Sequence, residues 1–285
     1  MARVFPSKTT PISCAKLSIE DVAKIFRRLE KSVLEQGDLE ISELLPQENE
    51  PSAEFEERKQ KIKESAFRVT VTINGSDGSS FFGDNEALFY SESLPDEISM
   101  VYMTNKTAYN GVARIDPNNG FELTLDFSKP PLLDFRNSIS SPTGNVSGLR
   151  ITGDRDSWVA TIHSAVMDIV DLRRTRRRLI HIGAAYDIGL AVIGFPLGFY
   201  FCRHSSPLIE KLFAESSVFL TSAAYFYLML LTLWIHRVMF EYARWIFPTL
   251  ELEKNNSNIV FHRGFWWTII VSVLGSIAYD LKALI

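Results

Sequence analysis

Residues 217–236 read SVFLTSAAYFYLMLLTLWIH, twenty residues in a row without Asp, Glu, Lys or Arg. An α-helix of this length spans about 30 Å, which is the thickness of the hydrocarbon core of a bilayer. The stretch ends at Arg237, and basic residues are common at the boundary between hydrocarbon and headgroups. The sequence therefore predicts a transmembrane helix here.

Two further apolar stretches flank this segment. Residues 179–202 contain a single charged side chain, Asp187. Residues 264–284 open with Gly-Phe-Trp-Trp, and paired tryptophans suit a membrane interface. We therefore expect an α-helical transmembrane region over residues 179–285, with about three spans at 179–202, 217–236 and 264–284.

The first predicted span contains a pattern that is typical of helix packing. Gly194 and Gly198 lie four residues apart, on one face of a helix, and small residues at this spacing let two helices approach closely. Pro196 between them should bend the helix. We expect this face to pack against a neighbouring helix.

The chain before residue 179 has the composition of a water-exposed domain. Ser18 is a predicted N-cap for a helix over 18–36, and a Pro- and Glu-rich stretch follows it, so residues 1–55 are interpreted as an N-terminal helix and a flexible linker. Residues 56–178 are interpreted as a cytosolic, antiparallel, β-rich α+β domain.

Within that domain, apolar residues alternate with polar ones at 67–73 and at 121–127, as in strands that bury one face. Strands are predicted around 67–73, 97–103, 121–127 and 149–152. Ala113 and Ile115, followed by Asp-Pro-Asn-Asn-Gly, predict one arm of a hairpin whose second arm is 121–127. A charged helix over 52–66 and an amphipathic helix after Asp156 complete the domain.

Basic residues near the predicted spans indicate the orientation, because positively charged loops stay in the cytosol. Nine Lys and Arg residues lie on the side of the N-terminal domain and three lie on the other side. The nine are Arg173, Arg174, Arg176, Arg177, Arg178, Arg237, Arg244, Lys254 and Arg263. We therefore expect a cell membrane protein, in the plasma or inner membrane, with its N-terminal domain in the cytosol.

The basic run Arg173, Arg174, Arg176, Arg177 and Arg178 directly precedes the first predicted span. At this place we interpret it as a topology signal that contacts lipid headgroups, and nucleic-acid binding as unlikely, because no aromatic-rich nucleic-acid module accompanies it. The expected partners are the lipid bilayer and a protein partner or further copies of the chain.

Asp187 is the most informative single residue, because a charge within a span is costly unless it meets protein or water. Two interpretations stay open. Asp187 reaches the headgroup zone or pairs with a basic side chain, or it faces a bundle interior and serves conduction together with Tyr186 and His236.

The sequence contains no signature of catalysis. Asp154 and Asp156 are interpreted as helix-capping residues rather than as a catalytic pair. The five histidines and two cysteines do not form a zinc motif, and hydrolase motifs are absent. We expect neither an enzyme nor a bound metal or cofactor.

The layout leads to two functional hypotheses. The first is a cytosolic sensing or docking domain coupled to a helical membrane anchor, such as a bacterial stress or antiviral membrane effector. The alternative is a subunit of an oligomeric channel or transporter, because three spans cannot enclose a wide pore in one copy.

Overall fold

The structure is a computed structural model that describes residues 6–48, 50–132 and 138–283. The chain divides into two compact units. The α+β unit comprises Met1–Ser128, Asn145–Thr175 and Thr249–Asn258, and the helical unit comprises Lys129–Gly144, Arg176–Pro248 and Ile259–Ile285. Residue 284 of the third predicted span lies outside the described residues.

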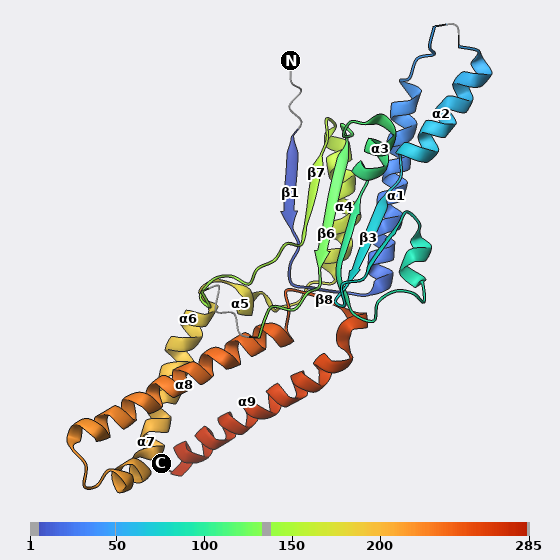
Figure 1. The fold of residues 1–285 in the computed structure, drawn as a ribbon. Helices are drawn as coiled ribbons and strands as arrows, with labels where there is room; N and C mark the ends of the chain where they lie inside the picture. The colour runs from blue at the N-terminus through green and yellow to red at the C-terminus, as the bar shows by residue number, and fades with distance from the viewer. Residues whose placement is uncertain (1–5, 49, 133–137, 284–285) are drawn as a thin grey trace. The chain divides into compact units, whose positions relative to one another are not determined.

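The α+β unit is built on an antiparallel sheet of six strands, in the order β1-β7-β6-β5-β3-β4 (Figure 1). The strands are β1 (Ser7–Pro11), β3 (Thr70–Gly75), β4 (Ser80–Gly83), β5 (Ile98–Thr104), β6 (Gly120–Asp126) and β7 (Gly148–Thr152). This confirms the predicted α+β fold with an antiparallel sheet. Strands β1 and β4 were not predicted.

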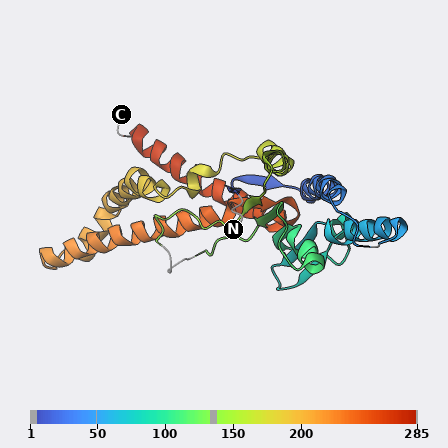
Figure 2. The ribbon, with the colours of Figure 1, turned by 90° about the horizontal axis from the view of Figure 1, so that it is seen from above.

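One face of the sheet carries the core. Phe121, Leu123 and Leu125 of β6 are fully buried, whereas the residues between them are partly exposed. Helices α1 (Ile19–Ser42) and α4 (Asp156–Leu172) cover this face, and Figure 2 shows both of them nearly end-on, on the same side of the sheet. Helix α2 (Ser52–Ala66) packs on the short helix α3 (Lys106–Ala113).

Helix α1 begins as the sequence predicts and ends later. The Ser18 side chain accepts from the Asp21 amide, and the Asp21 carboxylate accepts from the Ser18 amide, which forms a capping box. The helix continues beyond residue 36 through Gly37. A Cβ at this glycine would lie 2.7 Å from Cγ of Phe67, so Gly37 leaves room for a buried aromatic ring.

The hairpin predicted across Asp116–Gly120 is wrong. Ala113 ends helix α3, and Arg114 follows in the left-handed conformation, so no strand forms at 113–115. The neighbour of β6 is β5, and α3 lies between them in the chain. Asn105 fixes the start of β6. Its side chain donates to the carbonyl of Asn119 and accepts from the amide of Phe121, both at 2.9 Å.

A second, two-stranded sheet also belongs to the α+β unit, and the sequence did not reveal it. Strand β2 (Ala15–Leu17) pairs in parallel with β8 (Leu250–Leu252). All three residues of β8 are buried, as are Ala15 and Leu17 of β2. Strand β8 lies between the second and third apolar helices of the chain, yet its partner is near the N-terminus.

The helical unit contains three helices that are long and apolar enough to cross a membrane: Ala185–Leu212, Val218–Ile246 and Ile259–Ser276. The first consists of α6 (Ala185–Gly189), a π-helical turn η2 (Leu190–Gly194) and α7 (Phe195–Leu212), and a short helix α5 (Arg178–His181) precedes it. The others are α8 (Val218–Ile246) and α9 (Ser257–Ala283).

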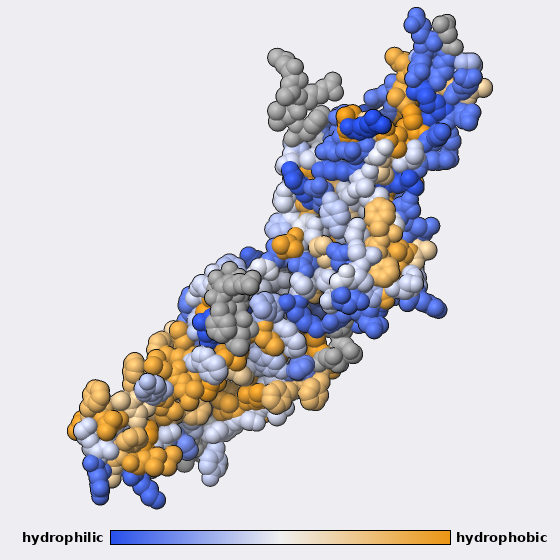
Figure 3. All heavy atoms as spheres, viewed as in Figure 1, coloured by the Kyte–Doolittle hydropathy of each residue, from blue (hydrophilic) through white to orange (hydrophobic). Residues whose placement is uncertain are grey.

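These helices expose apolar side chains almost everywhere, as the orange surface over them in Figure 3 shows. No more than 11% of each apolar window is buried within the structure. Contiguous apolar surface of this extent is not found on monomeric proteins in water, and it is the normal surface of a helix in lipid. The helical unit is therefore suited to a membrane.

Helix α8 continues without a break beyond the predicted span, to Ile246. Gly194 and Gly198 face α8: a Cβ at Gly198 would collide with the sulfur of Met229, and one at Gly194 would lie 3.3 Å from the ring of His236. Both glycines therefore permit the close packing of α7 on α8.

Candidate functional site

The chain passes repeatedly between the two units, and the residues at these crossings form the candidate site. Six segments alternate between the units, which makes five crossings. A domain that is merely tethered to an anchor needs one connection. The side chains that bind the chain next to these crossings, each within its own unit, are therefore the candidate functional residues.

Within the α+β unit, Cys14 binds the chain next to two of the crossings, at Thr175 and Thr249. Its amide donates to the carbonyl of Thr249, and its carbonyl accepts from the Thr175 hydroxyl at 3.1 Å. The residue is buried and has a φ of 58°, a left-handed conformation that a side chain adopts at a cost of about 1 kcal/mol. The backbone of Cys14 thus binds two segments that are distant in the sequence.

Within the helical unit, His181 binds the chain next to the crossing that follows Pro248. Nε2 lies 2.7 Å from the carbonyl oxygen of Phe247 and Nδ1 lies 2.9 Å from the hydroxyl of Thr143. The carbonyl can only accept, so Nε2 carries the proton and Nδ1 accepts from the threonine. The pKa of His181 is lowered to about 4, mainly by burial and also by the positive charges of Arg244 and Arg177, while the bond to Phe247 opposes the shift.

Arg244 binds the same region through its guanidinium. It is buried near the end of α8 and donates to three main-chain carbonyls, of Ile139, Ser141 and Ile180, each at 3.1 Å. A buried guanidinium is stable only when its donors are satisfied. Arg244 therefore attaches residues 139–141 and helix α5 to α8.

The part of the connection between strands β6 and β7 that precedes β7 is bound within both units. Ser141 is bound by Arg244, and Thr143 by His181 through its hydroxyl and its amide. Two residues later, the Asn145 side chain donates to the carbonyl of Ile12 at 2.6 Å, within the α+β unit. Gly144 lies between the last of these residues bound in the helical unit and the first one bound in the α+β unit.

The predicted basic run is divided between the units. Arg173 forms an ion pair with Asp21 at 2.9 Å, and Arg174 forms one with Asp171 at 2.8 Å, so these two arginines stabilise the α+β unit. Arg176, Arg177 and Arg178 belong to the helical unit. The guanidinium of Arg177 lies over the ring of Phe247.

The structure brings Tyr186 and His236 together, with ring centroids 5.7 Å apart, where α6 packs on α8. Asp187 forms its hydrogen bond with another part of the chain. Its carboxylate accepts from the hydroxyl of Ser140 at 2.7 Å, and the residue is exposed. Asp187 thus binds the same connection that Arg244 and His181 hold.

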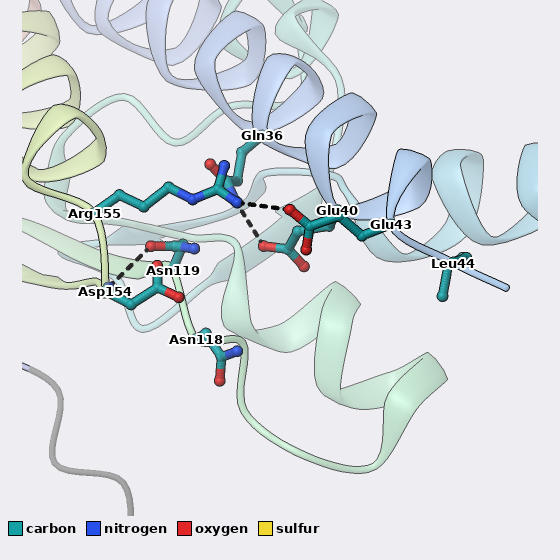
Figure 4. A pocket seen from close by; sticks show the side chains of 8 residues that line it. All are labelled: Gln36, Glu40, Glu43, Leu44, Asn118, Asn119, Asp154 and Arg155. Carbon is teal, nitrogen blue, oxygen red and sulfur yellow. Dashed lines mark hydrogen bonds and ion pairs between the residues drawn. The ribbon is translucent and has the colours of Figure 1, made fainter.

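The α+β unit contains a pocket of about 260 Å³ between the end of α1, the turn before β6 and the start of α4 (Figure 4). Among the described residues its lining is polar apart from Leu44: Gln36, Glu40, Glu43, Asn118, Asn119, Asp154 and Arg155. Arg155 donates to Glu43 across it at 3.0 Å. Ligand pockets are usually larger and mostly apolar, so this pocket fits only a small polar molecule.

Asp154 and Asp156 do not act as side-chain caps. Arg155 occupies the N-cap position of α4 without a capping bond, and Asp156 contributes only a negative charge in the first turn. The amide of Asp154 donates to Asn119. Within the part of the chain that the structure describes, no group of three His, Cys, Asp or Glu residues is placed to hold a metal.

Comparisons of the chain with protein-family models, with curated proteins and with solved structures give no match. The functional argument therefore depends on the geometry of the crossings. Arg244 could have been suspected from the sequence as a charge next to a long apolar helix. The sequence offers no comparable sign for His181 or Cys14.

We predict that acid destabilises the folded chain through His181. The unfolded histidine binds a proton below pH 6.5 and the folded one only near pH 4, so stability is complete above pH 6.5 and falls between these values. The loss should be on the order of 2 to 3 kcal/mol. The glutamine amide in His181→Gln can keep both hydrogen bonds but does not titrate. Thermal unfolding in detergent across this pH range should therefore show a smaller loss of stability in His181→Gln than in the wild-type chain. Equal losses would contradict this.

Proposed function

We propose that the protein is a non-catalytic, multi-pass membrane protein whose α+β unit senses or docks a partner and transmits that event to the membrane helices. The observation that carries the proposal is the connection between β6 and β7. It leaves the sheet, is bound by Arg244, His181 and Asp187 in the helical unit, and returns to the sheet. A change in the spacing of these two strands would act directly on the ends of the helices.

The buried crossings support transmission rather than anchoring alone. An anchor requires one flexible linker, whose backbone remains solvated. Here, Phe247 is bound by His181 in the helical unit and Thr249 by Cys14 in the α+β unit, with only Pro248 between them. Rigid, hydrogen-bonded connections transmit displacements that a linker would absorb.

We further propose that the α+β unit lies in the cytosol. Strand β8 belongs to this unit, so the chain between Thr175 and Thr249 must leave and return to one side, which two crossings by α7 and α8 accomplish. The excess of basic residues on that side favours the cytosol. An intracellular sensor that acts on the membrane, such as a stress or antiviral effector, would have this arrangement.

The proposed orientation predicts which positions a membrane-impermeant maleimide reaches in intact cells. In a background without Cys14 and Cys202, a cysteine at the exposed Glu215, between α7 and α8, should be labelled at once. Cysteines at Arg178 and Glu253 should be labelled only after permeabilisation. Labelling at Arg178 but not Glu215 would reverse the orientation, and different accessibility of Arg178 and Glu253 would contradict the shared side.

The proposed coupling predicts a non-additive pair of substitutions in the full-length chain. Leu149→Ala removes a fully buried side chain of β7, at a cost of about 2 to 5 kcal/mol, and should raise hydrogen exchange at residues 242–247 of α8. Arg244→Gln should raise it too. In the double variant, Leu149→Ala should cause almost no further increase in hydrogen exchange, because Arg244→Gln has already broken the connection between β7 and α8.

Tyr225→Phe provides the matched control for this cycle. The Tyr225 hydroxyl donates to Ser206 at 2.9 Å, so its loss also removes a hydrogen bond of the helical unit, away from the crossings. Leu149→Ala and Tyr225→Phe should act independently. If the effects of Arg244→Gln and Leu149→Ala on hydrogen exchange are as additive as those of Tyr225→Phe and Leu149→Ala, the helices are an anchor without coupling.

A subunit of an oligomeric channel or transporter is the second candidate, favoured by the contact of Tyr186 with His236 at the packed face of α6 and α8. This alternative predicts ionic currents from the chain in reconstituted liposomes. Asp187→Asn should then alter them without lowering insertion into the bilayer. Absence of currents at equal insertion would favour the sensing module.

A further inference from the structure

The pocket of the α+β unit is lined by two buried amide side chains that are only partly paired. Gln36 is 6% exposed and Asn119 is 3% exposed. Gln36 Nε2 donates to Glu40 at 2.9 Å, and Asn119 Oδ1 accepts from the amide of Asp154. Among the described residues, Gln36 Oε1 and Asn119 Nδ2 have no hydrogen-bond partner. One acceptor and one donor are therefore available within the same pocket.

The orientation of the Asn119 amide is fixed by its surroundings. An N–H group lies on the side of Asp154, so the amide oxygen must face Asp154 and the nitrogen must face the other way. In Figure 4 this nitrogen lies on the side of helix α1. The main-chain carbonyl of Asn119 accepts from Asn105 at 2.9 Å, and a Cβ at Gly153 would lie 3.0 Å from Asn119 Oδ1. The chain thus holds a buried donor toward the pocket.

The charges around these amides favour a cation. The lining contains the carboxylates of Glu40, Glu43 and Asp154 and one guanidinium, that of Arg155, which gives a formal charge of −2. Arg155 forms an ion pair with Glu43 at 3.0 Å. The Asp154 carboxylate has no counter-charge within the part of the chain that the structure describes. A concave site with an excess of one charge concentrates ligands of the opposite charge.

The size and spread of the lining favour an organic cation over a metal ion. The volume of about 260 Å³ is far more than one water molecule needs. Over the described residues, the carboxylates do not converge into a group that could hold a metal. Ammonium and guanidinium groups form strong, charge-assisted hydrogen bonds to carboxylates, and an organic cation can contact separated ones. Buried amides are normally paired, so such a ligand should also carry an acceptor for Asn119.

We propose that this pocket binds a small organic cation, whose N–H groups contact Glu40 and Asp154 and whose acceptor oxygen contacts Asn119 Nδ2. The inference names a ligand class for the sensing that is proposed above, and it rests on that proposed function for the consequence of binding. An anion would meet three carboxylates. An uncharged molecule would leave Asp154 without a counter-charge.

The test is isothermal titration of the full-length chain in detergent with three related probes. L-Arginine carries a guanidinium and a carboxylate, agmatine lacks the carboxylate, and citrulline replaces the guanidinium with an uncharged urea group. L-Arginine should bind at least about tenfold more tightly than citrulline, the factor of one hydrogen bond to a charged group. Equal affinities of these two probes, or no binding of either cation, would overturn the proposal.

Asp154→Asn should weaken the binding of L-arginine about tenfold, because it removes a carboxylate that contacts the cation. Asp156→Asn is the matched control. It removes the same charge two residues further along the chain, from an exposed side chain outside the lining of the pocket, and should leave the affinity almost unchanged. An equal loss in both variants would show a diffuse attraction of cations and would overturn the site.

Asn119→Asp tests the position of the acceptor oxygen. The variant keeps an oxygen for the amide of Asp154 and replaces the donor Nδ2 with a second acceptor. It should weaken the binding of L-arginine, whose carboxylate it repels, more than the binding of agmatine. An equal change for both probes would overturn the contact assigned to Asn119, and thermal unfolding checks that the variant is folded.

Hydrogen exchange at residues 242–247 of α8, measured with saturating L-arginine, separates this inference from the proposed function. Binding together with altered exchange supports both. If L-arginine binds in the manner given above while the exchange stays the same, the site stands and the proposed transmission fails. If neither cation binds, the site is wrong, and the cycle of Leu149→Ala with Arg244→Gln still decides the transmission.

Discussion

The pairing of β2 with β8 is the constraint on which the rest of the structure depends. Three residues between two long apolar helices complete a sheet with a strand near the N-terminus, and both strands are buried. Buried main-chain groups need hydrogen-bond partners, so neither strand is stable without the other. The chain must therefore return to the α+β unit after α8, and the two units cannot be separated by a single cut.

Two solvents act on one chain, and each determines a different pattern of side chains. In the α+β unit, apolar residues lie on one face of the sheet and the other face is polar, because water surrounds the domain. In the helical unit, apolar residues surround the helices, because lipid tails accept apolar side chains on every face. Helices in lipid gain little by hiding apolar surface, so close packing depends on small residues such as Gly194 and Gly198.

Several polar side chains of the helical unit lie near the crossings. Arg244 satisfies three carbonyls, His181 bridges Thr143 and Phe247, and Asp187 accepts from Ser140. Each of these bonds orders a stretch of chain that would otherwise end in a flexible linker. Cys14, in the left-handed conformation, forms bonds of the same kind within the α+β unit. A fragment that ends at residue 178 would lack β8, so partners are best sought with the full chain.

The sequence by itself determined the parts of the protein that depend on local pattern. Alternation of apolar residues located β3 and β6, the N-cap at Ser18 located the start of α1, and apolar length located the three long apolar helices, because each of these signals lies within the element that it predicts. Only the tertiary structure decided the rest. Strands β1, β2 and β8 are too short to show a period, α3 replaced the hairpin arm at Ala113 and Ile115, and α1 passes Gly37 because Phe67 packs there. The sites at Arg244, His181 and Cys14 join residues more than 60 positions apart, and partners at such distances are set by the packing of the whole chain.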